Sequence, residues 1–179
     1  MANRNKIWPY SSSYQLVPAA FDFYANAYKS AYPAQWRVSQ SAGNHREYNS
    51  TSFARYHMMP VSRVLFPSQK VQFHDSHARH FGRRELYFAY KDAVQPLLFF
   101  DASVNVRTTG DANEGWNPRR QTRDTPTVFQ YDPEEWEAEL RNGGWEGTDT
   151  VVGHYRWTRG ALSGIDYGAP EISTGQPIN

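Results

Sequence analysis

Apolar residues concentrate just past the middle of the chain, and their pattern predicts a β-hairpin. The densest apolar run, Pro96-Leu97-Leu98-Phe99-Phe100, ends at Asp101-Ala102 and resumes in alternation as Val104-x-Val106. A short aromatic-rich run closed by a turn-forming Asp is typical of a buried strand that enters a tight turn. We therefore expect strands over 97–101 and 103–108, with Leu97 through Phe100 inside the protein.

Alternation between apolar and polar residues predicts further strands. Val71-x-Phe73 and Leu86-x-Phe88-x-Tyr90 have the period of a half-buried strand, and Val152-x-His154-x-Arg156 repeats it. With weaker segments included, the additional strands are expected over 13–17, 70–75, 85–90, 127–131 and 151–158. Since strands and helices do not alternate along the chain, we expect an antiparallel sheet.

Helical spacing is limited to short stretches, expected over 60–66, within 19–34 and over 132–140. The last begins with Asp132 as a cap and Pro133 at the first helical position. The predicted fold class is therefore α+β: an antiparallel β-sheet with short helices and long ordered loops.

Composition favours a single domain, 1–179, with loose tails at 1–12 and 168–179. Only 39% of the 179 residues are hydrophobic, yet 16% are aromatic. Tyr and Trp bury a large apolar body but keep a polar atom that needs a partner. We therefore expect a thin aromatic core wrapped by hydrogen-bonded loops.

Charge and cysteine content exclude several classes of protein. The net charge of +1 argues against a nucleic-acid partner, and the absence of cysteine removes disulfides, thiolate metal sites and cysteine nucleophiles. No apolar stretch approaches the ~20 residues that span a bilayer, so the chain as given is expected to be soluble. Residues 1–95 carry 12 Lys/Arg and 5 Asp/Glu, and the remainder carries 7 and 13. The two parts should attract each other, within one molecule or between neighbours.

Two clusters have metal-ligand chemistry. Three imidazoles and a carboxylate lie within seven residues and suit a transition metal; the alternative is a polar loop after a strand. This cluster consists of His74, Asp75, His77 and His80. A second cluster lies on a glycine-bounded loop and suits calcium; the alternative is a turn whose polar side chains bond their own backbone. It consists of Asp111, Asn113 and Glu114.

Exposed cations and indole rings suggest binding surfaces. Arg79, Arg83 and Arg84, with Phe81 and Tyr87 nearby, form an interaction patch that could grip phosphates; the alternative is a set of solvated residues at a sheet edge. Flat indoles stack on sugar rings, although core packing is the commoner use of Trp; the indoles in question are Trp116, Trp136, Trp145 and Trp157. No nucleophile elbow, phosphate loop, dinucleotide fingerprint or zincin helix is present, so we expect a non-enzymatic protein.

An ordered series of short blocks covers most of residues 60–172. The blocks are Phe66-Pro67-Ser68-Gln69-Lys70-Val71, His74-Asp75, His80-Phe81, 96–104, Gly110-Asp111-Ala112-Asn113, 155–160, 164–168 and Glu171-Ile172. In this order they resemble the C-terminal region of prepilin-type proteins of planctomycete-like bacteria, which end near a strand–turn–strand marked H-x9-D-G. The chain departs from that motif at two positions, with Lys91 in place of the His and Ala102 in place of the Gly.

The resemblance implies a pilin-like head with a structural role in a surface or periplasmic fibre or a type II secretion pseudopilus. It implies other protein subunits as partners, in a homo-oligomer or filament, at a periplasmic or cell-surface location. Prepilins carry an N-terminal membrane helix that is not found here, so the chain is either a piece of a longer anchored protein or a stand-alone relative. Major pseudopilins bind calcium in a Gly/Asp-rich loop, which corresponds here to 111–114; no other cofactor is expected. The competing hypotheses are a small metal-dependent enzyme that uses the His/Asp cluster and a glycan-binding module that uses exposed Trp.

Overall fold

Short strands and single turns of 3-10 helix make up the part of the chain that the structure describes. The computed structural model describes residues 13–20, 59–115, 128–158 and 161–168. The strands are β1 (Tyr14–Leu16), β2 (Val71–Asp75), β3 (His77–Ala78), β4 (Leu86–Tyr87), β5 (Val94–Phe99), β6 (Val104–Thr108), β7 (Val128–Tyr131) and β8 (Asp149–Val152). The 3-10 turns are η1 (Pro18–Ala20), η3 (Val61–Arg63), η4 (Thr109–Asp111), η5 (His154–Trp157) and η6 (Ala161–Ser163). Within these ranges, no helix has the length and apolar character needed to cross a membrane.

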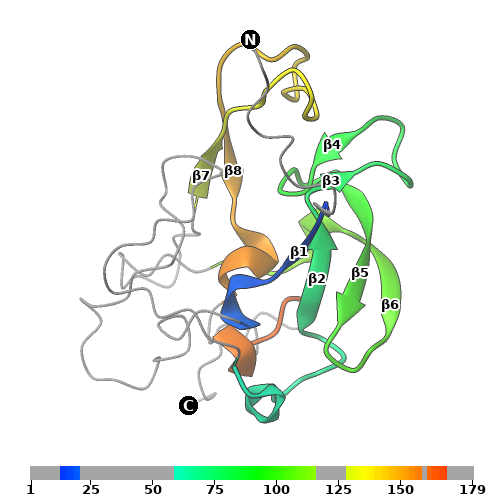
Figure 1. The fold of residues 1–179 in the computed structure, drawn as a ribbon, viewed down its shortest axis with the longest axis vertical. Coiled ribbons are helices and arrows are strands. Elements are labelled where there is room, and N and C mark those ends of the chain that lie inside the picture. The colour runs from blue at the N-terminus through cyan, green and yellow to red at the C-terminus, as the bar shows by residue number, and fades with distance from the viewer. Residues whose placement is uncertain (1–12, 21–58, 116–127, 159–160, 169–179) are drawn as a thin grey trace, which may run out of the picture.

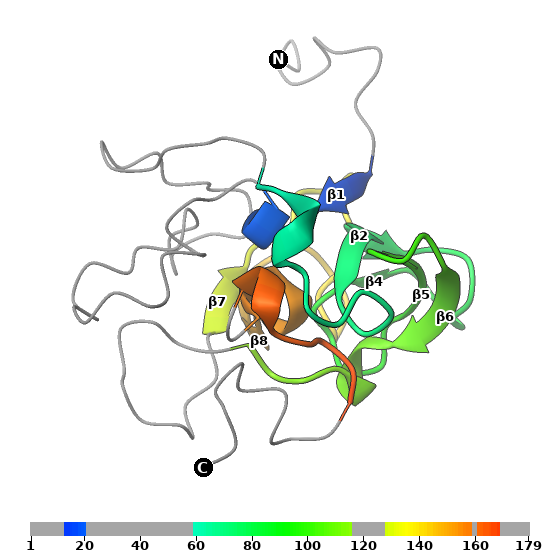
Figure 2. The ribbon, with the colours of Figure 1, turned by 90° about the horizontal axis from the view of Figure 1, so that it is seen from below.

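All strand pairs between described residues are antiparallel, as expected. A four-stranded sheet has the order β1-β2-β5-β6, and two ribbons are formed by β3-β4 and β7-β8. The four-stranded sheet lies on one side of the molecule and the β7–β8 ribbon on the other (Figure 1). Seen from below, η5 and η6 lie between them (Figure 2). The structure therefore shows a β-rich fold.

The predicted hairpin is present, although its first strand, β5, begins at Val94 and ends at Phe99, where 97–101 was expected. Its register is uninterrupted, with Leu98 paired to Val104 and Val94 to Thr108. Its burial differs from the prediction of a strand buried on both faces. Leu97 and Phe99 are buried, whereas Leu98 and Phe100 are half-buried. Alternation arises because successive side chains of a strand point to opposite faces, and only one face of this sheet is fully covered.

The turn of the hairpin is held by Asp101. Its Oδ1 accepts hydrogen bonds from the backbone N–H of Ser103 (2.9 Å) and from the Ser103 hydroxyl (2.6 Å), which lower the pKa of the Asp101 carboxyl. Ala102 adopts a left-handed conformation with φ of 66°. Because a Cβ atom disfavours that conformation, this is a position that suits glycine.

Replacing Ala102 by glycine is therefore expected to raise the free energy of unfolding by roughly 0.5–1 kcal/mol. Relief of left-handed strain outweighs the greater backbone entropy that glycine gives the unfolded chain. Urea denaturation followed by circular dichroism measures the change. Ser103→Gly, one residue further on, is the matched control and is expected to lower stability, since it removes a hydroxyl that Asp101 binds.

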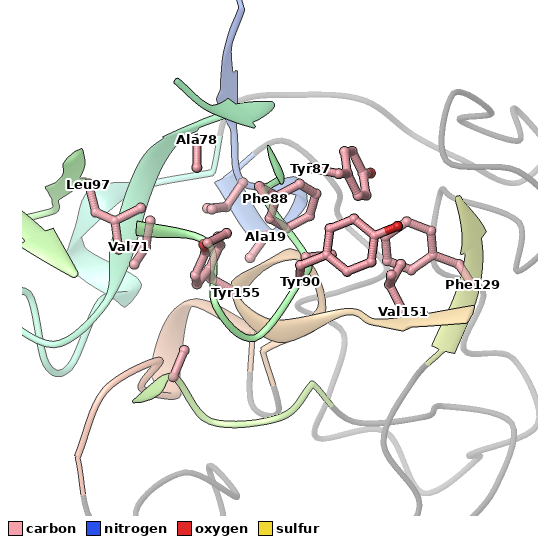
Figure 3. Packing of buried hydrophobic residues seen from close by; sticks show 14 of the residues in the cluster. Ala19, Val71, Ala78, Tyr87, Phe88, Tyr90, Leu97, Phe129, Val151 and Tyr155 are labelled. Carbon is pink, nitrogen blue, oxygen red and sulfur yellow. The ribbon is translucent and has the colours of Figure 1, made fainter. Parts of the chain in front are cut away.

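The core is dominated by aromatic rings from several elements, as the composition predicted. Tyr87 of β4 stacks on Tyr131 of β7, with ring centroids 4.0 Å apart and planes 7° apart. Phe88 contacts Phe129 of β7 and Tyr155 of η5, which connects the β7–β8 ribbon to η5. Figure 3 shows the rings of Tyr87, Phe88, Phe129 and Tyr155 in the same cluster of buried residues as Leu97 of β5. The core therefore joins the four-stranded sheet to the β7–β8 ribbon.

The predicted helix over 132–140 is wrong. Only a single turn forms, where the N–H of Glu137 donates to the carbonyl of Glu134 (2.8 Å). A helix over 132–140 would direct the N–H of Leu140 to the carbonyl of Trp136, but this N–H donates to Gly144 O (2.9 Å). The end of the segment is held from outside, where the Tyr131 hydroxyl donates to Ala138 O and Trp145 Nε1 donates to Glu137 O. Tertiary hydrogen bonds thus override the favourable helix start.

Three other predicted elements are shorter than expected. The segment over 60–66 forms only the 3-10 turn η3, whose side chains are exposed. The strand over 85–90 stops at Tyr87, because the next residues turn and are all buried. The strand over 151–158 stops at Val152, and the following residues form η5, in which His154 and Tyr155 are both buried. Of the helix expected within 19–34, only the end of η1 is described; the remainder and most of both tails lie outside the described residues.

Candidate functional site

The predicted transition-metal cluster is divided between different environments. His74 is buried against the rings of Phe88 and Tyr155, with centroids 4.4 and 5.2 Å away, and its Nδ1 lies 3.0 Å from Asp75 O. Asp75 accepts from the N–H of His77, whereas His80 is exposed beyond β3. Within the described residues, no three His, Cys, Asp or Glu side chains group so as to hold a metal ion.

His77 is nevertheless in an unusual environment. Its Nδ1 lies 2.8 Å from the Ser76 hydroxyl and 3.3 Å from Nη2 of Arg79. Burial, followed by the charge of Arg79, lowers the pKa of His77. The ring is therefore held neutral as part of the β3–β4 packing.

The predicted calcium residues take separate partners. Asn113 donates from its backbone N–H to Asp166 O (2.6 Å) and from Nδ2 to Ile165 O (3.3 Å). Glu114 pairs with Lys91 at 3.1 Å, and Asp111 is exposed at the end of η4. In this arrangement the loop anchors the segment around Asp166, whereas the turn interpretation expected bonds to the loop's own backbone.

The predicted arginine patch is exposed on the loop that joins β3 to β4. Arg79 pairs with Glu85 across the base of this loop, with Nε 2.8 Å from Oε1. Arg84 donates from Nη2 to the carbonyl of Arg141 (2.7 Å), and Arg83 points into solvent-accessible surroundings. Phe81, at the tip, is 52% exposed. The structure thus brings these cations together on one loop.

A buried ion pair that the sequence analysis missed joins Lys70 to Asp166. The Nζ of Lys70 lies 2.7 Å from Asp166 Oδ2 and 2.6 Å from the Thr158 hydroxyl, and the two charged side chains are 0% and 1% exposed. Asp166 Oδ2 also accepts from the N–H of Val71 (2.8 Å), and its Oδ1 accepts from Thr158. Burial lowers the pKa of Lys70, and the charge of Asp166 opposes that shift.

This pair fastens two segments that lie 96 residues apart in the sequence. Gln69 O accepts the N–H groups of Asp166 (3.0 Å) and Tyr167 (3.3 Å) beside the ion pair. No local sequence pattern links Lys70 to Asp166, because the contact joins positions 96 residues apart. Complete burial suits a structural clamp rather than a catalytic group.

A second buried network consists of neutral groups. Gln95 of β5 accepts from the N–H of Asp75 (3.1 Å) and donates to the Tyr155 hydroxyl (2.6 Å). Thr109 donates to Phe88 O and lies 2.8 Å from that hydroxyl. Such satisfied networks favour a single packing arrangement. Desolvation and neighbouring charges raise the pKa of Tyr155 above its ordinary value, so the hydroxyl stays protonated.

The exposed apolar side chains mark surfaces rather than cavities. Val104 and Val106 of β6 are 65% and 47% exposed, and Trp136 is 59% exposed on the loop between β7 and β8. Trp145, on the same loop, is partly exposed; Trp157 belongs to η5, and Trp116 lies outside the described residues. A scan against protein-family models and searches of curated proteins and of solved structures gave no match.

Proposed function

We propose that this chain is a non-enzymatic structural subunit, the head of a pilin- or pseudopilin-like protein, that works through contacts with other protein subunits. The observation that carries the proposal is strand β6 with its exposed valines. The antiparallel sheet and the long loops fit a pilin-like head of the α+β class, and the block resemblance adds the assembly context. A periplasmic or cell-surface location belongs to the same proposal.

Strand β6 has the features of an edge that accepts another strand. It is the last strand in the order β1-β2-β5-β6, and its five pairs with β5 follow without a bulge. Proteins that stay monomeric usually protect such an edge with bulges, prolines or lysines. In β6 the only charged residue is Arg107, and both Val104 and Val106 are exposed. We assign this edge to strand pairing with β6 of a neighbouring subunit.

The buried ion pair supports a role in which the subunit transmits force to its neighbours. Lys70 precedes β2, which is hydrogen-bonded to β5, and Asp166 belongs to the last described segment. Because the pair joins the sheet to that segment, separation of the two requires a buried charge to lose its partner. A subunit that transmits force through an assembly benefits from an ion pair that holds its segments together.

Single-cysteine crosslinking tests the proposed strand contact, since the chain has no cysteine of its own. A Val106→Cys variant, displayed through an N-terminal His tag on nickel-chelating vesicles at high surface density, is expected to form covalent dimers under mild oxidation. Val106 is the middle residue of β6, so full antiparallel pairing of two β6 strands places it opposite its copy. The matched control is Thr150→Cys, also exposed but on the other ribbon, for which no dimer is expected.

Two outcomes of the crosslinking experiment would contradict the proposal. Equal crosslinking of both variants would indicate random encounters on the vesicle, and absence of crosslinking by Val106→Cys would contradict the β6 contact. Adding Val104→Lys to Val106→Cys supplies the second arm, because a charge at the edge should abolish the dimer without unfolding the monomer.

A further inference from the structure

We propose that the β3–β4 loop and the β7–β8 loop together form a self-complementary surface that docks a second copy of this chain about a two-fold axis. The inference deepens the proposed structural function, on which it rests, by naming one partner and one mode of contact. The basic loop comprises residues 79–85, and the acidic loop comprises residues 132–147.

The basic loop concentrates positive charge around an exposed ring. Arg79, Arg83 and Arg84 are all exposed on it, with Glu85 as its single acid. Phe81 at the tip is 52% exposed, although aromatic rings usually gain from burial. The Arg79–Glu85 pair spans the ends of the loop and limits its opening. A cationic loop that presents an aromatic ring is suited to an acidic protein surface with apolar area of its own.

The acidic loop combines exposed carboxylates with an exposed apolar ring. Exposed carboxylates follow one another along it, while Arg141 is its one basic residue; the exposed acids are Asp132, Glu134, Glu135, Glu139 and Glu146. Trp136, between them, is 59% exposed. The loop is fixed by its own hydrogen bonds, from Leu140 N to Gly144 O (2.9 Å) and from Trp145 Nε1 to Glu137 O (3.0 Å). It therefore presents its charges in a defined arrangement.

The two loops lie side by side on one molecule. Arg84 of the basic loop donates to the backbone carbonyl of Arg141 in the acidic loop (2.7 Å), and Arg141 pairs with Asp92 at 3.6 Å. Both loops project at the same end of the molecule (Figure 1). Two adjacent patches of opposite charge match themselves when a copy is rotated by a half turn, because each basic loop then faces an acidic one.

Size and chemistry suit a specific contact of modest strength. Together the loops approach the roughly 20–30 residues that each partner contributes to a standard interface. Aromatic anchors such as Phe81 and Trp136 carry affinity in such contacts, and charges determine register and association rate. Since the charges are exposed, the contact should weaken as salt rises.

A charge-swap experiment with the whole chain tests the two-fold contact. The first variant reverses the basic loop (Arg83→Glu with Arg84→Glu), and the second reverses the acidic loop (Glu135→Lys with Glu139→Lys). All chains carry Val104→Lys in addition, which removes the β6 contact and leaves the loops as the tested surface. Sedimentation velocity at low salt is then expected to show dimers for the chain with wild-type loops and an at least 100-fold weaker self-association, as order of magnitude, for each loop variant alone. An equimolar mixture of the two variants should form dimers again, since both contacts of the mixed dimer join opposite charges.

Failure of the mixture to dimerise, with both variants folded by circular dichroism, would overturn the two-fold contact. Wild-type self-association in either variant alone would do so as well. Rescue in the mixture cannot arise from misfolding, so it isolates the charge pairing. Crosslinking through Val106→Cys is read separately at the β6 edge, and its result therefore decides the proposed function independently of this surface.

Discussion

Replacing Asp166 by alanine is expected to lower the free energy of unfolding by about 3–5 kcal/mol, because Lys70 is left as a charge in the interior without its partner. The substitution also removes the acceptor of the Val71 N–H and a partner of the Thr158 hydroxyl. Total stabilities of single domains are about 5–15 kcal/mol, so this loss removes a large fraction. Urea denaturation followed by tryptophan fluorescence measures it.

Two further variants separate the charge from the hydrogen bonds. Asp166→Asn keeps an acceptor for Val71 and should lose less than alanine, which also keeps the comparison possible if the alanine variant does not fold. Lys70→Met combined with Asp166→Leu removes both charges and should cost less than either single change. The exposed pair is the control: Glu85→Ala, opposite Arg79, is expected to change stability by less than about 1 kcal/mol. A similar loss of stability on breaking the buried pair and the exposed pair would contradict the view that burial makes the Lys70–Asp166 pair more costly to break.

The local sequence pattern was sufficient to predict the central hairpin but not the contact between Lys70 and Asp166. The run that ends in Phe99 and the turn at Asp101 are encoded within a dozen residues, and hydrogen bonds of the turn itself reinforce them. The ion pair depends on a contact between residues 96 positions apart. Spacing carries no information about such a contact, and a lysine at a strand start is most often solvated.

The failed helix over 132–140 shows the same limit in another form. Asp132 and Pro133 make a favourable start, but the N–H of Leu140 donates to Gly144 O, and the Tyr131 hydroxyl and the Trp145 indole hold the segment through Ala138 O and Glu137 O. Local preference is worth only tenths of a kcal/mol per residue, whereas a buried aromatic ring with its polar atom satisfied is worth several times more. The predicted metal site of the His/Asp cluster has the same limit. His74 lies buried in a strand and His80 lies on an exposed loop, so closeness in sequence does not place their side chains together.

The two proposed contacts use different parts of one molecule. Strand β6 lies at the outer edge of the four-stranded sheet, while the paired loops project at the end of the β3–β4 and β7–β8 ribbons (Figure 1). Each contact alone is isologous and would give a dimer. Two isologous contacts on distinct surfaces give an open chain in which they alternate. Disruption of one should therefore leave dimers held by the other, a signature that random aggregation does not produce.

Acidification from pH 7 to pH 4 is expected to destabilise the protein through His154. The ring is 1% exposed, and burial lowers its pKa to about 4, although the charge of Glu114 and the backbone of Ala112 and Asn113 partly favour the charged form and Lys91 opposes it. An unfolded histidine titrates near 6.5. Between these values the unfolded chain binds more protons, so the free energy of unfolding falls as pH falls, by about 3 kcal/mol for this residue.

A His154→Leu variant isolates this contribution, because leucine cannot take up a proton. Its free energy of unfolding should fall less between pH 7 and pH 4 than that of the wild type, by about 3 kcal/mol. Some acid sensitivity should persist in the variant, since burial also lowers the pKa of His77. The exposed His80→Gln is the matched control and should retain the wild-type slope. Parallel pH profiles for the leucine variant and the wild type would show that His154 is accommodated in its charged form, and that acid acts on the fold elsewhere.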